Sequence, residues 1–448
     1  MRLRKCSLWA TIGVVIVILL YLFLSKELPK DVSRLPFILG LIALDLYLWS
    51  SVKKIVFVYH KLFVVIISVL YWLSTIGLLV AAASVFFVDF YSIDSVFRAY
   101  FFGVIMVMYA AKLVPLFFLF LNDVYRSIRF IVHMIVPSKR RVYSEEFRNS
   151  RSKFLRQIGL ATGGLFLSTM FTGMFKWVYD FKVWHHKIVL PDMHDSFNGI
   201  KIVQLSDMHL GSMATNKALQ EAVDIINNMQ ADVIFFTGDL VNYETAEAFR
   251  FKEVLRKLKA KQGVYAVLGN HDYGEYRQWD TLHEKEENMN DLYAFYNDID
   301  WKLLNNENVI LKRNNDSIAI VGVENWGDHP RFPKRGDLKK AMHGAEDADV
   351  KILLSHDPSH WSSIVIPEQY DIDITLSGHT HGMQFGVEIP GLKWSPAKYM
   401  YKRWAGLYDN DNNGKKQYLY VNRGLGVIGY PGRVGILPEI TLIELYNS

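Results

Sequence analysis

Long apolar runs dominate the first 180 residues of this 448-residue chain and constrain its fold more than any other feature. The run 7–25 is long enough to cross a bilayer whose hydrocarbon core is ~30 Å thick. It lacks a small-residue cleavage site and further apolar runs follow it, so a cleaved signal peptide is a poor match. The other candidates are 35–51, 62–88, 99–121 and 158–178. We therefore predict about five transmembrane helices in residues 1–180 and a soluble domain over 181–448.

The basic residues between these runs predict how the chain is oriented in the membrane. They gather at the N-terminus, between the second and third runs, and most densely in the loop 122–157. Basic loops remain in the cytoplasm, so five spans would place the C-terminal domain on the extracytoplasmic side of a bacterial-type inner or plasma membrane. If the fifth run is instead an amphipathic surface anchor, the domain stays cytoplasmic. Because the net charge of +5 reflects these loops, we expect no nucleic-acid partner.

The ionisable residues Asp45 and Lys112 lie within the apolar runs. Charge is costly inside a bilayer, so each is a candidate functional residue. The more conservative interpretation is that they lie near helix ends or pair across the bundle. A transporter would carry more polar residues along its spans, which disfavours that class of function.

From residue 184 onward the chain alternates between apolar runs of strand character and amphipathic runs of helical period. The predicted strands are 199–205, 231–237, 263–268, 317–323, 350–354, 371–376 and 439–445, and the predicted helices are 216–229 and 246–259. An Asn-Asn-Gly turn at 412–414 predicts a hairpin. This rhythm predicts an α/β domain, and we expect two sheets packed as a sandwich with flanking helices.

Five short runs in this half carry residues that bind hard or borderline metal ions. They are Asp207-Met208-His209, Gly238-Asp239, Gly269-Asn270-His271-Asp272, Ser355-His356 and Gly378-His379-Thr380-His381-Gly382. Carboxylate, amide oxygen and imidazole without thiolate suit a pair of divalent cations such as Mn, Fe or Zn. Most of the runs follow a predicted strand, and ligands of open α/β sheets gather beyond the carboxyl ends of the strands. The sequence therefore predicts a metal centre at one edge of the sheet.

The five runs, in this order, resemble the calcineurin-like metallophosphoesterase superfamily, whose pattern is D-x-H, G-D, G-N-H-[DE], H and G-H-x-H. The resemblance covers about residues 198–448 and is strongest to the membrane-anchored YkuE/YaeI-type branch. It implies a β-sandwich flanked by helices and a hydrolase, a phosphodiesterase among the possibilities. One departure is Met383, which stands where the family usually has glycine and would reshape that side of the pocket.

Carried onto this sequence, the resemblance implies two metal sites that share the carboxylate of Asp239. The ligands of one cation would be Asp207, His209 and His381, and those of the other Asn270, His356 and His379. Two such cations, about 3.5–4 Å apart, clamp a phosphate and activate a water molecule. His271 would face the leaving group as a proton donor or charge stabiliser. Asp272 would orient His271 or, alternatively, cap a helix.

Residues near the C-terminus extend the predicted site. Arg433 lies among glycines and is a candidate substrate contact for a second phosphate or a head group, whereas a surface salt bridge is the favoured interpretation of Arg423. The aromatic residues Tyr399, Tyr401 and Trp404 would line a substrate groove or lie at the membrane surface.

The resemblance implies a phosphorylated small molecule or a lipid head group as the substrate, with membrane lipids as further partners. The related branch includes enzymes that cleave UDP-diacylglucosamine, which favours a lipid-linked or nucleotide-sugar diphosphate. The alternative is a catalytically weak membrane scaffold or sensor that binds phosphorylated ligands. All seven predicted ligands and His271 are present, which favours an active enzyme.

Overall fold

The structure is a computed structural model that describes residues 35–84, 87–135, 145–412 and 414–447. Contacts within the chain divide it into two compact units. The helical unit comprises Met1–Ser92 and Phe101–Phe171, and the α/β unit comprises Ile93–Tyr100 and Thr172–Ser448. The division assigns the first residues of one long helix and the last residues of another to the α/β unit.

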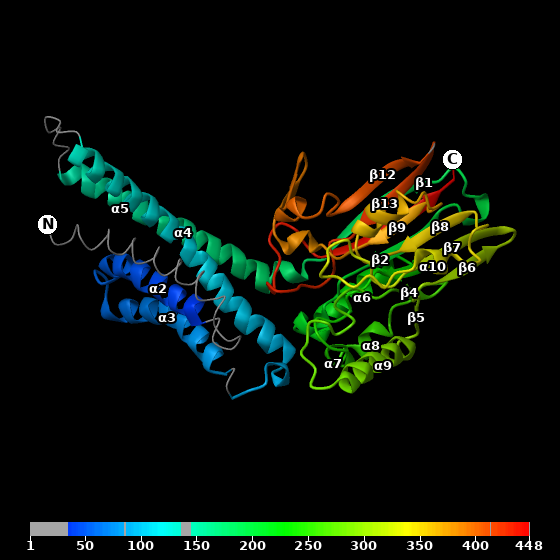
Figure 1. The fold of residues 1–448 in the computed structure, drawn as a ribbon, viewed down its shortest axis with the longest axis horizontal. Coiled ribbons are helices and arrows are strands. Elements are labelled where there is room, and N and C mark those ends of the chain that lie inside the picture. Colours follow the sequence, from blue (N-terminus) through cyan, green and yellow to red (C-terminus); the bar gives the residue numbers. More distant parts are fainter. Residues whose placement is uncertain (1–34, 85–86, 136–144, 413, 448) are drawn as a thin grey trace. The chain divides into compact units, whose positions relative to one another are not determined.

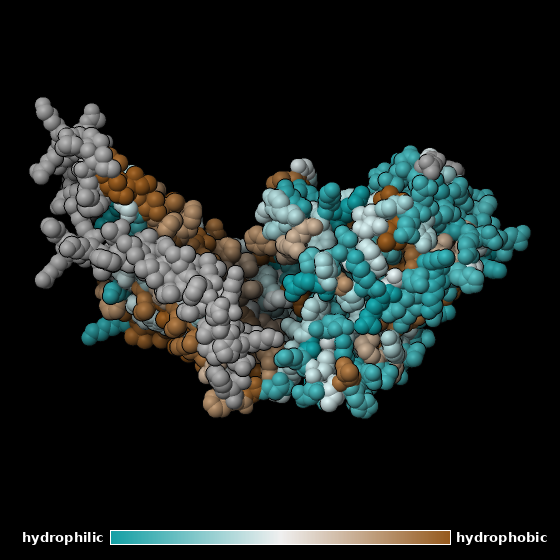
Figure 2. Space-filling view, viewed as in Figure 1, coloured by the Kyte–Doolittle hydropathy of each residue, from teal (hydrophilic) through white to brown (hydrophobic). Residues whose placement is uncertain are grey.

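Four long helices make up most of the described part of the helical unit (Figure 1). They are α2 Leu35–Val56, α3 Lys61–Ser84, α4 Ser95–Ile135 and α5 Glu145–Phe175. Among the described residues, the segments long and apolar enough to cross a membrane are Leu35–Lys53, Lys61–Ser84, Ser95–Ile128 and Lys153–Tyr179. These match the last four predicted runs, while the run 7–25 lies outside the described residues. Figure 2 shows that the visible surface of these helices is mostly apolar, as expected of helices that face lipid, whereas that of the α/β unit is mostly hydrophilic.

Asp45 and Lys112 form a buried ion pair between α2 and α4. The Lys112 ammonium lies 2.7 Å from a carboxylate oxygen of Asp45. The hydroxyl groups of Thr75 and Tyr109 donate to the other oxygen, and Lys112 also donates to Ser74. Pairing across the bundle is the conservative interpretation given above, and the hydrogen bonds satisfy both charges inside an apolar unit.

Two six-stranded sheets form the centre of the α/β unit (Figure 1). The first has the order β1 Lys182–Val189, β14 Glu439–Tyr446, β2 Ile200–Leu205, β3 Val233–Phe236, β4 Val264–Ala266 and β5 Trp301–Leu303. The second has the order β12 Gly406–Asn412, β13 Lys415–Val421, β9 Ile374–Ser377, β8 Val350–Leu354, β7 Asp316–Gly322 and β6 Glu307–Arg313. Strands β2 to β5 are parallel, as are β7, β8 and β9. Their carboxyl ends therefore meet along one edge of each sheet.

The apolar core lies between the sheets and on their outer faces. Side chains such as Ile202 and Val233 from the first sheet pack with Ile320 and Ile352 from the second in one buried cluster. The outer face of the first sheet is covered by α6 Asn216–Asn228, α8 Lys252–Leu255 and α9 Leu282–Asp298. Helix α10, Leu338–Met342, packs on the second sheet. The predicted helix-flanked sandwich is confirmed.

The structure also departs from the predicted elements. The single predicted helix 246–259 is wrong: it is replaced by α7, Ala246–Phe249, and α8, separated by a turn in which Phe251 is completely buried. Packing of this aromatic side chain overrides the helical period of the sequence. The elements β1, β5, β6, α9 and the hairpin formed by β10 Val387–Ile389 and β11 Leu392–Trp394 were not predicted.

Candidate metal centre

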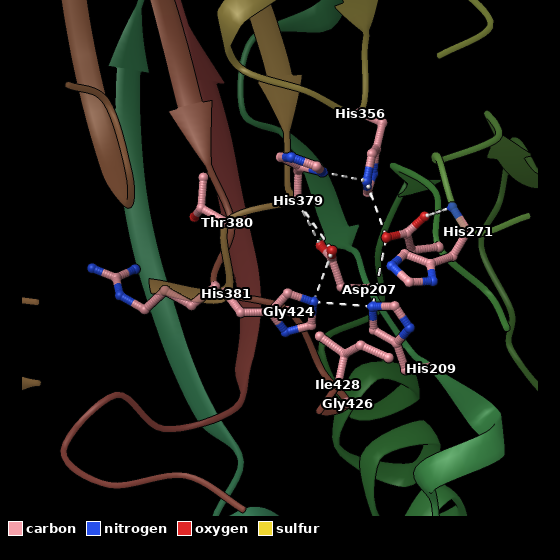
Figure 3. Close-up of polar contacts among 12 residues, drawn as sticks. Asp207, His209, His271, His356, His379, Thr380, His381, Gly424, Gly426 and Ile428 are labelled. Atoms are coloured by element: carbon pink, nitrogen blue, oxygen red, sulfur yellow. Dashed lines mark hydrogen bonds and ion pairs between the residues drawn. The ribbon is translucent and has the colours of Figure 1, made fainter. Parts of the chain in front are cut away.

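The predicted ligands follow the parallel strands and converge where the two sheets meet at their carboxyl edges (Figure 3). Asp207 and His209 come directly after β2. Asp239 follows β3 and Asn270 follows β4. The second sheet contributes His356 after β8, and His379 and His381 after β9. Residues as much as 174 positions apart in sequence, from 207 to 381, are thus brought together by strand order alone.

Six of these side chains form two tight groups. In the first group, the ligand atoms of Asp207, His209 and His381 all lie within 4.8 Å of one another. The same holds for Asp239, His356 and His379 in the second group. One carboxylate oxygen of Asp239 lies 3.2 Å from His356 Nε2 and 3.5 Å from His209 Nε2. Asp239 therefore faces both groups, which is the position that a bridging carboxylate requires.

The spacing and chemistry of these donors fit divalent cations. When two donor atoms each lie about 2.1 Å from one cation and the donor–cation–donor angle is about 90°, the donor atoms lie about 3.0 Å apart. The Nε2 atoms of His209 and His381 are 3.0 Å apart, and His379 Nδ1 is 3.2 Å from His356 Nε2. The buried Oδ1 atom of Asn270 has no hydrogen-bond partner among the described residues, although buried polar atoms normally have one. An amide oxygen left without a donor in this setting suits a cation.

Backbone strain is concentrated on the same residues. Five of the seven predicted ligands have a positive φ, namely Asp207 (51°), His209 (43°), Asp239 (59°), His379 (70°) and His381 (49°). This conformation is uncommon for residues other than glycine, and such strain gathers at functional sites because the surrounding structure enforces it. The backbone is thus bent so that successive side chains enter one small volume.

Two glycines allow the backbone to approach the carboxylates of Asp207 and Asp239. A Cβ atom on Gly378 would lie 2.2 Å from a carboxylate oxygen of Asp207, and one on Gly269 would lie 2.2 Å from a carboxylate oxygen of Asp239. Neither distance is compatible with a side chain. The glycines of the motifs are therefore required by this close approach.

Hydrogen bonds and burial set the protonation of the imidazoles. His356 Nδ1 donates to the carbonyl of Thr237 at 2.7 Å, which leaves Nε2 directed at the centre. Burial lowers the pKa of His209 and of His379, which favours neutral rings. Burial also acts to lower the pKa of His356, but the adjacent Asp239 raises it to about 10. A cation would replace that proton, so metal binding at His356 releases a proton.

Comparison with known proteins agrees with this geometry. The family model described as calcineurin-like phosphoesterase matches residues 200–383, and the model described as the transmembrane domain of a probable calcineurin-like phosphoesterase matches 30–177. The UDP-2,3-diacylglucosamine pyrophosphatase LpxG of Chlamydia trachomatis is 30% identical over 53% of this chain and 81% of its own length. The chain belongs to the calcineurin-like phosphoesterase family. This is a family of hydrolases, and the match to its transmembrane domain, together with the four apolar helices, shows that this member is integrated in a membrane.

Two further relatives are similar in sequence to this phosphoesterase, and the name of one of them also describes a transmembrane protein. A transmembrane protein with a metallophosphoesterase domain from Danio rerio is 30% identical over 60% of this chain and 58% of its own length. The metallophosphoesterase YkuE of Bacillus subtilis is 28% identical over 59% of this chain and 85% of its own length. The chain thus spans less than two thirds of the length of the Danio rerio relative.

His271 of the phosphoesterase lies beside the first group of ligands. Its ring centroid is 4.9 Å from that of His209 (Figure 3). On another side its ring stacks on Tyr276, with the centroids 4.3 Å apart. Its backbone N–H donates to Asp239 at 2.8 Å. Its Nδ1 atom is 2.8 Å from the carbonyl oxygen of Asn242, so this nitrogen carries the proton and Nε2 remains for a substrate atom.

Asp272 has different partners from the predicted ones. Instead of a hydrogen bond to His271, its carboxylate accepts from the backbone N–H groups of Asp239 at 2.9 Å, Leu240 at 2.8 Å and Gly269 at 2.8 Å. The side chain is completely buried. The helix-cap alternative is also wrong, because Asp272 lies in a turn and the next described helix begins at Leu282. Asp272 joins the loops after β3 and β4, and thereby positions Asp239 and Asn270.

The predicted substrate contact of Arg433 is contradicted. Its guanidinium is completely buried and donates to the carbonyl oxygens of Arg423 at 2.9 Å, Gly424 at 2.9 Å and Gly426 at 2.6 Å. Gly426 in turn donates its N–H to the carbonyl of Asp207 at 2.8 Å. Because these carbonyls occupy the guanidinium, Arg433 supports the loop that packs under Asp207.

The surface salt bridge predicted for Arg423 is also wrong. Arg423 is 2% exposed and pairs with Glu388 at 2.6 Å and Glu439 at 2.5 Å. Arginines among glycines suggested a flexible loop, but both guanidinium groups are buried, and a Cβ on Gly424 would lie 3.3 Å from the guanidinium of Arg433.

The sequence did not predict a role at the metal centre for three further residues around it, Tyr401, Asp357 and Glu247. The hydroxyl of Tyr401 lies 2.9 Å from His379 Nε2, and a carboxylate oxygen of Asp357 lies 3.5 Å from the same nitrogen. Glu247 accepts from the N–H groups of Asn242 and Tyr243 and so fixes the loop that contacts His271. Only Asp357 had a local signal, since it directly follows the ligand His356.

Proposed function

We propose that this phosphoesterase hydrolyses a phosphoester or pyrophosphate bond by means of two divalent cations, Mn, Fe or Zn. Asp207, His209 and His381 would bind one cation, and Asn270, His356 and His379 the other. The observation that carries the proposal is the position of the Asp239 carboxylate, within 3.5 Å of a histidine from each group.

The donor set supports this assignment electrostatically. When bound, two cations of this class withdraw charge from the phosphoryl oxygens and acidify a water molecule for in-line attack at phosphorus. The shared carboxylate of Asp239 offsets the repulsion between the cations. Neutral imidazoles complete the ligand set without surplus negative charge, which leaves net positive charge for an anionic substrate.

His271 would complete the reaction at the leaving group. The carbonyl of Asn242 accepts a hydrogen bond from the Nδ1–H group, and the Tyr276 ring stacks on the imidazole. Protonated His271 would present an Nε2–H group to the oxygen that leaves, donate that proton as the bond to phosphorus breaks, and stabilise the developing negative charge.

A lipid-linked substrate at the membrane is the substrate class we favour. The support is the membrane-integrated helices and the similarity to LpxG, whose name gives a lipid-bearing pyrophosphate as its substrate. We assign residues 1–180 to the membrane and 181–448 to the phosphoesterase domain. The basic residues of 122–157 favour a cytoplasmic connection between α4 and α5, which would place the phosphoesterase domain outside the cytoplasm.

Hydrolysis by the purified full chain tests the proposal. The substrates are bis-p-nitrophenyl phosphate, p-nitrophenyl phosphate and UDP-2,3-diacylglucosamine, each after treatment with a chelator and re-addition of Mn²⁺, Fe²⁺ or Zn²⁺. We expect metal-dependent hydrolysis that Asp239→Asn reduces by at least a hundredfold. Asp409→Asn, which alters an exposed carboxylate on β12, is the matched control. Hydrolysis that survives Asp239→Asn contradicts the assignment.

A further inference from the structure

An exposed apolar surface lies on the hairpin β10–β11 and on the short helix that follows it, Pro396–Tyr399. Its large side chains are Ile389, Leu392, Tyr399 and Met400, which are 58%, 51%, 74% and 64% exposed. We refer to these four residues as the hairpin surface. Ile389 and Leu392 pair across the hairpin, and Tyr399 and Met400 are consecutive in sequence. A short segment that exposes four large apolar side chains is a candidate binding surface.

The hairpin surface adjoins the metal centre. Tyr401, the residue after Met400, places its hydroxyl 2.9 Å from His379. Ser395, which follows β11, donates to the carbonyl of Gly382 at 2.6 Å, and Gly382 directly follows the ligand His381. The middle of the segment that carries the surface and its C-terminal end are thus fixed to the turn that contains two of the predicted ligands.

The base of the hairpin is also connected to the end of α5. Phe385 forms a parallel bridge with Val434, and the N–H of Gly386 donates to the Val434 carbonyl at 2.9 Å. The neighbouring Arg433 N–H donates to the carbonyl of Gly173 at 3.2 Å. Gly173 is in close contact with this loop, since a Cβ there would lie 2.7 Å from the Arg433 carbonyl oxygen.

That connection joins the hairpin to the C-terminal part of a candidate membrane span. Gly173 belongs to the α/β unit but lies near the end of the candidate span Lys153–Tyr179. The ends of spans lie among the lipid head groups. The hairpin begins one residue after Gly386, which is hydrogen-bonded to the loop that contacts the end of this span.

The charges around the hairpin surface indicate what it binds. Lys398 and Lys402 are exposed beside Tyr399 and Met400, whereas the ammonium of Lys393 donates to the carbonyl of Ala405 at 2.5 Å and is not directed at the solvent. Apolar and aromatic side chains among lysines enter the boundary between head groups and acyl chains, because burial of apolar area adds to attraction by anionic lipids.

We propose that the hairpin surface inserts into the head-group region of an anionic bilayer and admits lipid-borne phosphoesters to the metal centre. The membrane insertion depends only on the properties of the hairpin surface. The delivery of substrate rests on the proposed function, because it requires hydrolysis at the adjacent cations. The substrate class is therefore a lipid whose phosphate lies at head-group depth.

Fluorescence quenching in nanodiscs tests the insertion without any activity. The full chain with Cys6→Ser and Leu392→Cys is labelled with an environment-sensitive dye and reconstituted with phosphatidylglycerol and lipids brominated on their acyl chains. The control is Val189→Cys, 47% exposed at the end of β1. At this position the end of β1 pairs with the end of β14, which in turn pairs with the start of β2. The predicted ligands follow the end of β2, so Val189 lies at the opposite end of the sheet. We expect quenching at position 392 to exceed that at 189 several-fold. Equal quenching at the two positions overturns the insertion.

Activity on two substrates tests the delivery. The double variant Ile389→Asp, Leu392→Asp is compared with Val189→Asp in the same nanodiscs. We expect kcat/KM for UDP-2,3-diacylglucosamine in the disc to fall at least tenfold in the double variant, with hydrolysis of soluble bis-p-nitrophenyl phosphate unchanged. An equal effect on both substrates, or an effect on neither, overturns the delivery. If the unsubstituted chain hydrolyses neither substrate, the proposed function fails together with the delivery step, while the quenching result still decides the insertion.

Discussion

His271 Nδ1 lies 2.8 Å from the carbonyl oxygen of Asn242, and this contact determines which ring nitrogen faces the substrate. The loop that provides the carbonyl is fixed by Glu247, whose carboxylate accepts from the N–H groups of Asn242 at 2.6 Å and Tyr243 at 3.2 Å. Arg98, near the start of α4, contacts the other oxygen of Glu247 at 3.4 Å. A residue near the start of a candidate membrane span thus contributes to the placement of the proposed proton donor.

Substitution of Glu247 tests this arrangement. Glu247→Ala leaves the N–H groups of Asn242 and Tyr243 without this acceptor, so the Asn242 carbonyl moves and His271 loses its orientation. We expect kcat for a soluble phosphodiester to fall about tenfold or more, with KM and metal content unchanged and partial rescue by Glu247→Gln. Glu253→Gln, whose side chain is 77% exposed, is the control. A loss of bound metal in Glu247→Ala would assign Glu247 a general structural role instead.

Substitution of Arg433 separates support from substrate binding. Arg433→Lys keeps the charge but cannot donate to three carbonyls in the same geometry. We expect the free energy of unfolding to fall by about 2–4 kcal/mol, since buried carbonyls lose their donors, while KM stays near that of the unsubstituted enzyme. Calorimetry and steady-state kinetics measure the two quantities, with the exposed Arg256→Lys as the control. A raised KM at unchanged stability would instead support the prediction that Arg433 contacts the substrate.

His360 predicts a pH dependence of stability. Burial lowers its pKa to about 4, whereas an unfolded histidine titrates near 6.5. Between these values the unfolded chain binds the proton more tightly, so the stability due to neutral His360 is complete above pH ~6.5 and is lost as the pH falls toward 4. We expect His360→Asn to reduce the fall in Tm between pH 7.5 and 5.0. An identical fall in both proteins would show that His360 is not the titrating group.

The buried ion pair of the helical unit predicts a non-additive pair of substitutions. Lys112→Met leaves the carboxylate of Asp45 buried without its cation, which costs roughly 3–5 kcal/mol. We expect Asp45→Asn combined with Lys112→Met to recover a large part of that loss in thermal unfolding of detergent-solubilised protein. Additive effects of the two changes would mean that the ammonium and carboxylate do not stabilise each other.

The sequence predicted which residues meet at the carboxyl edges of the sheets, because their signals are local. Most of the runs that contain these residues follow an apolar strand, and the glycines beside Asn270 and His379 mark tight turns. The roles of Asp272, Arg433 and Glu247 could not be predicted in this way, because each depends on which loops become neighbours after folding. Arg98 and Glu247 are 149 positions apart. The break between α7 and α8 was missed for the same reason, since burial of Phe251 depends on the sheet beneath it.

The metal content of the purified full chain tests the central claim most directly. Elemental analysis after reconstitution with Mn²⁺ should give about two cations per chain for the unsubstituted protein. The bridging position of Asp239 predicts that Asp239→Asn retains one or fewer, while Asp409→Asn retains about two. Two cations bound equally well without the Asp239 carboxylate, or none bound by the unsubstituted chain, would contradict the account.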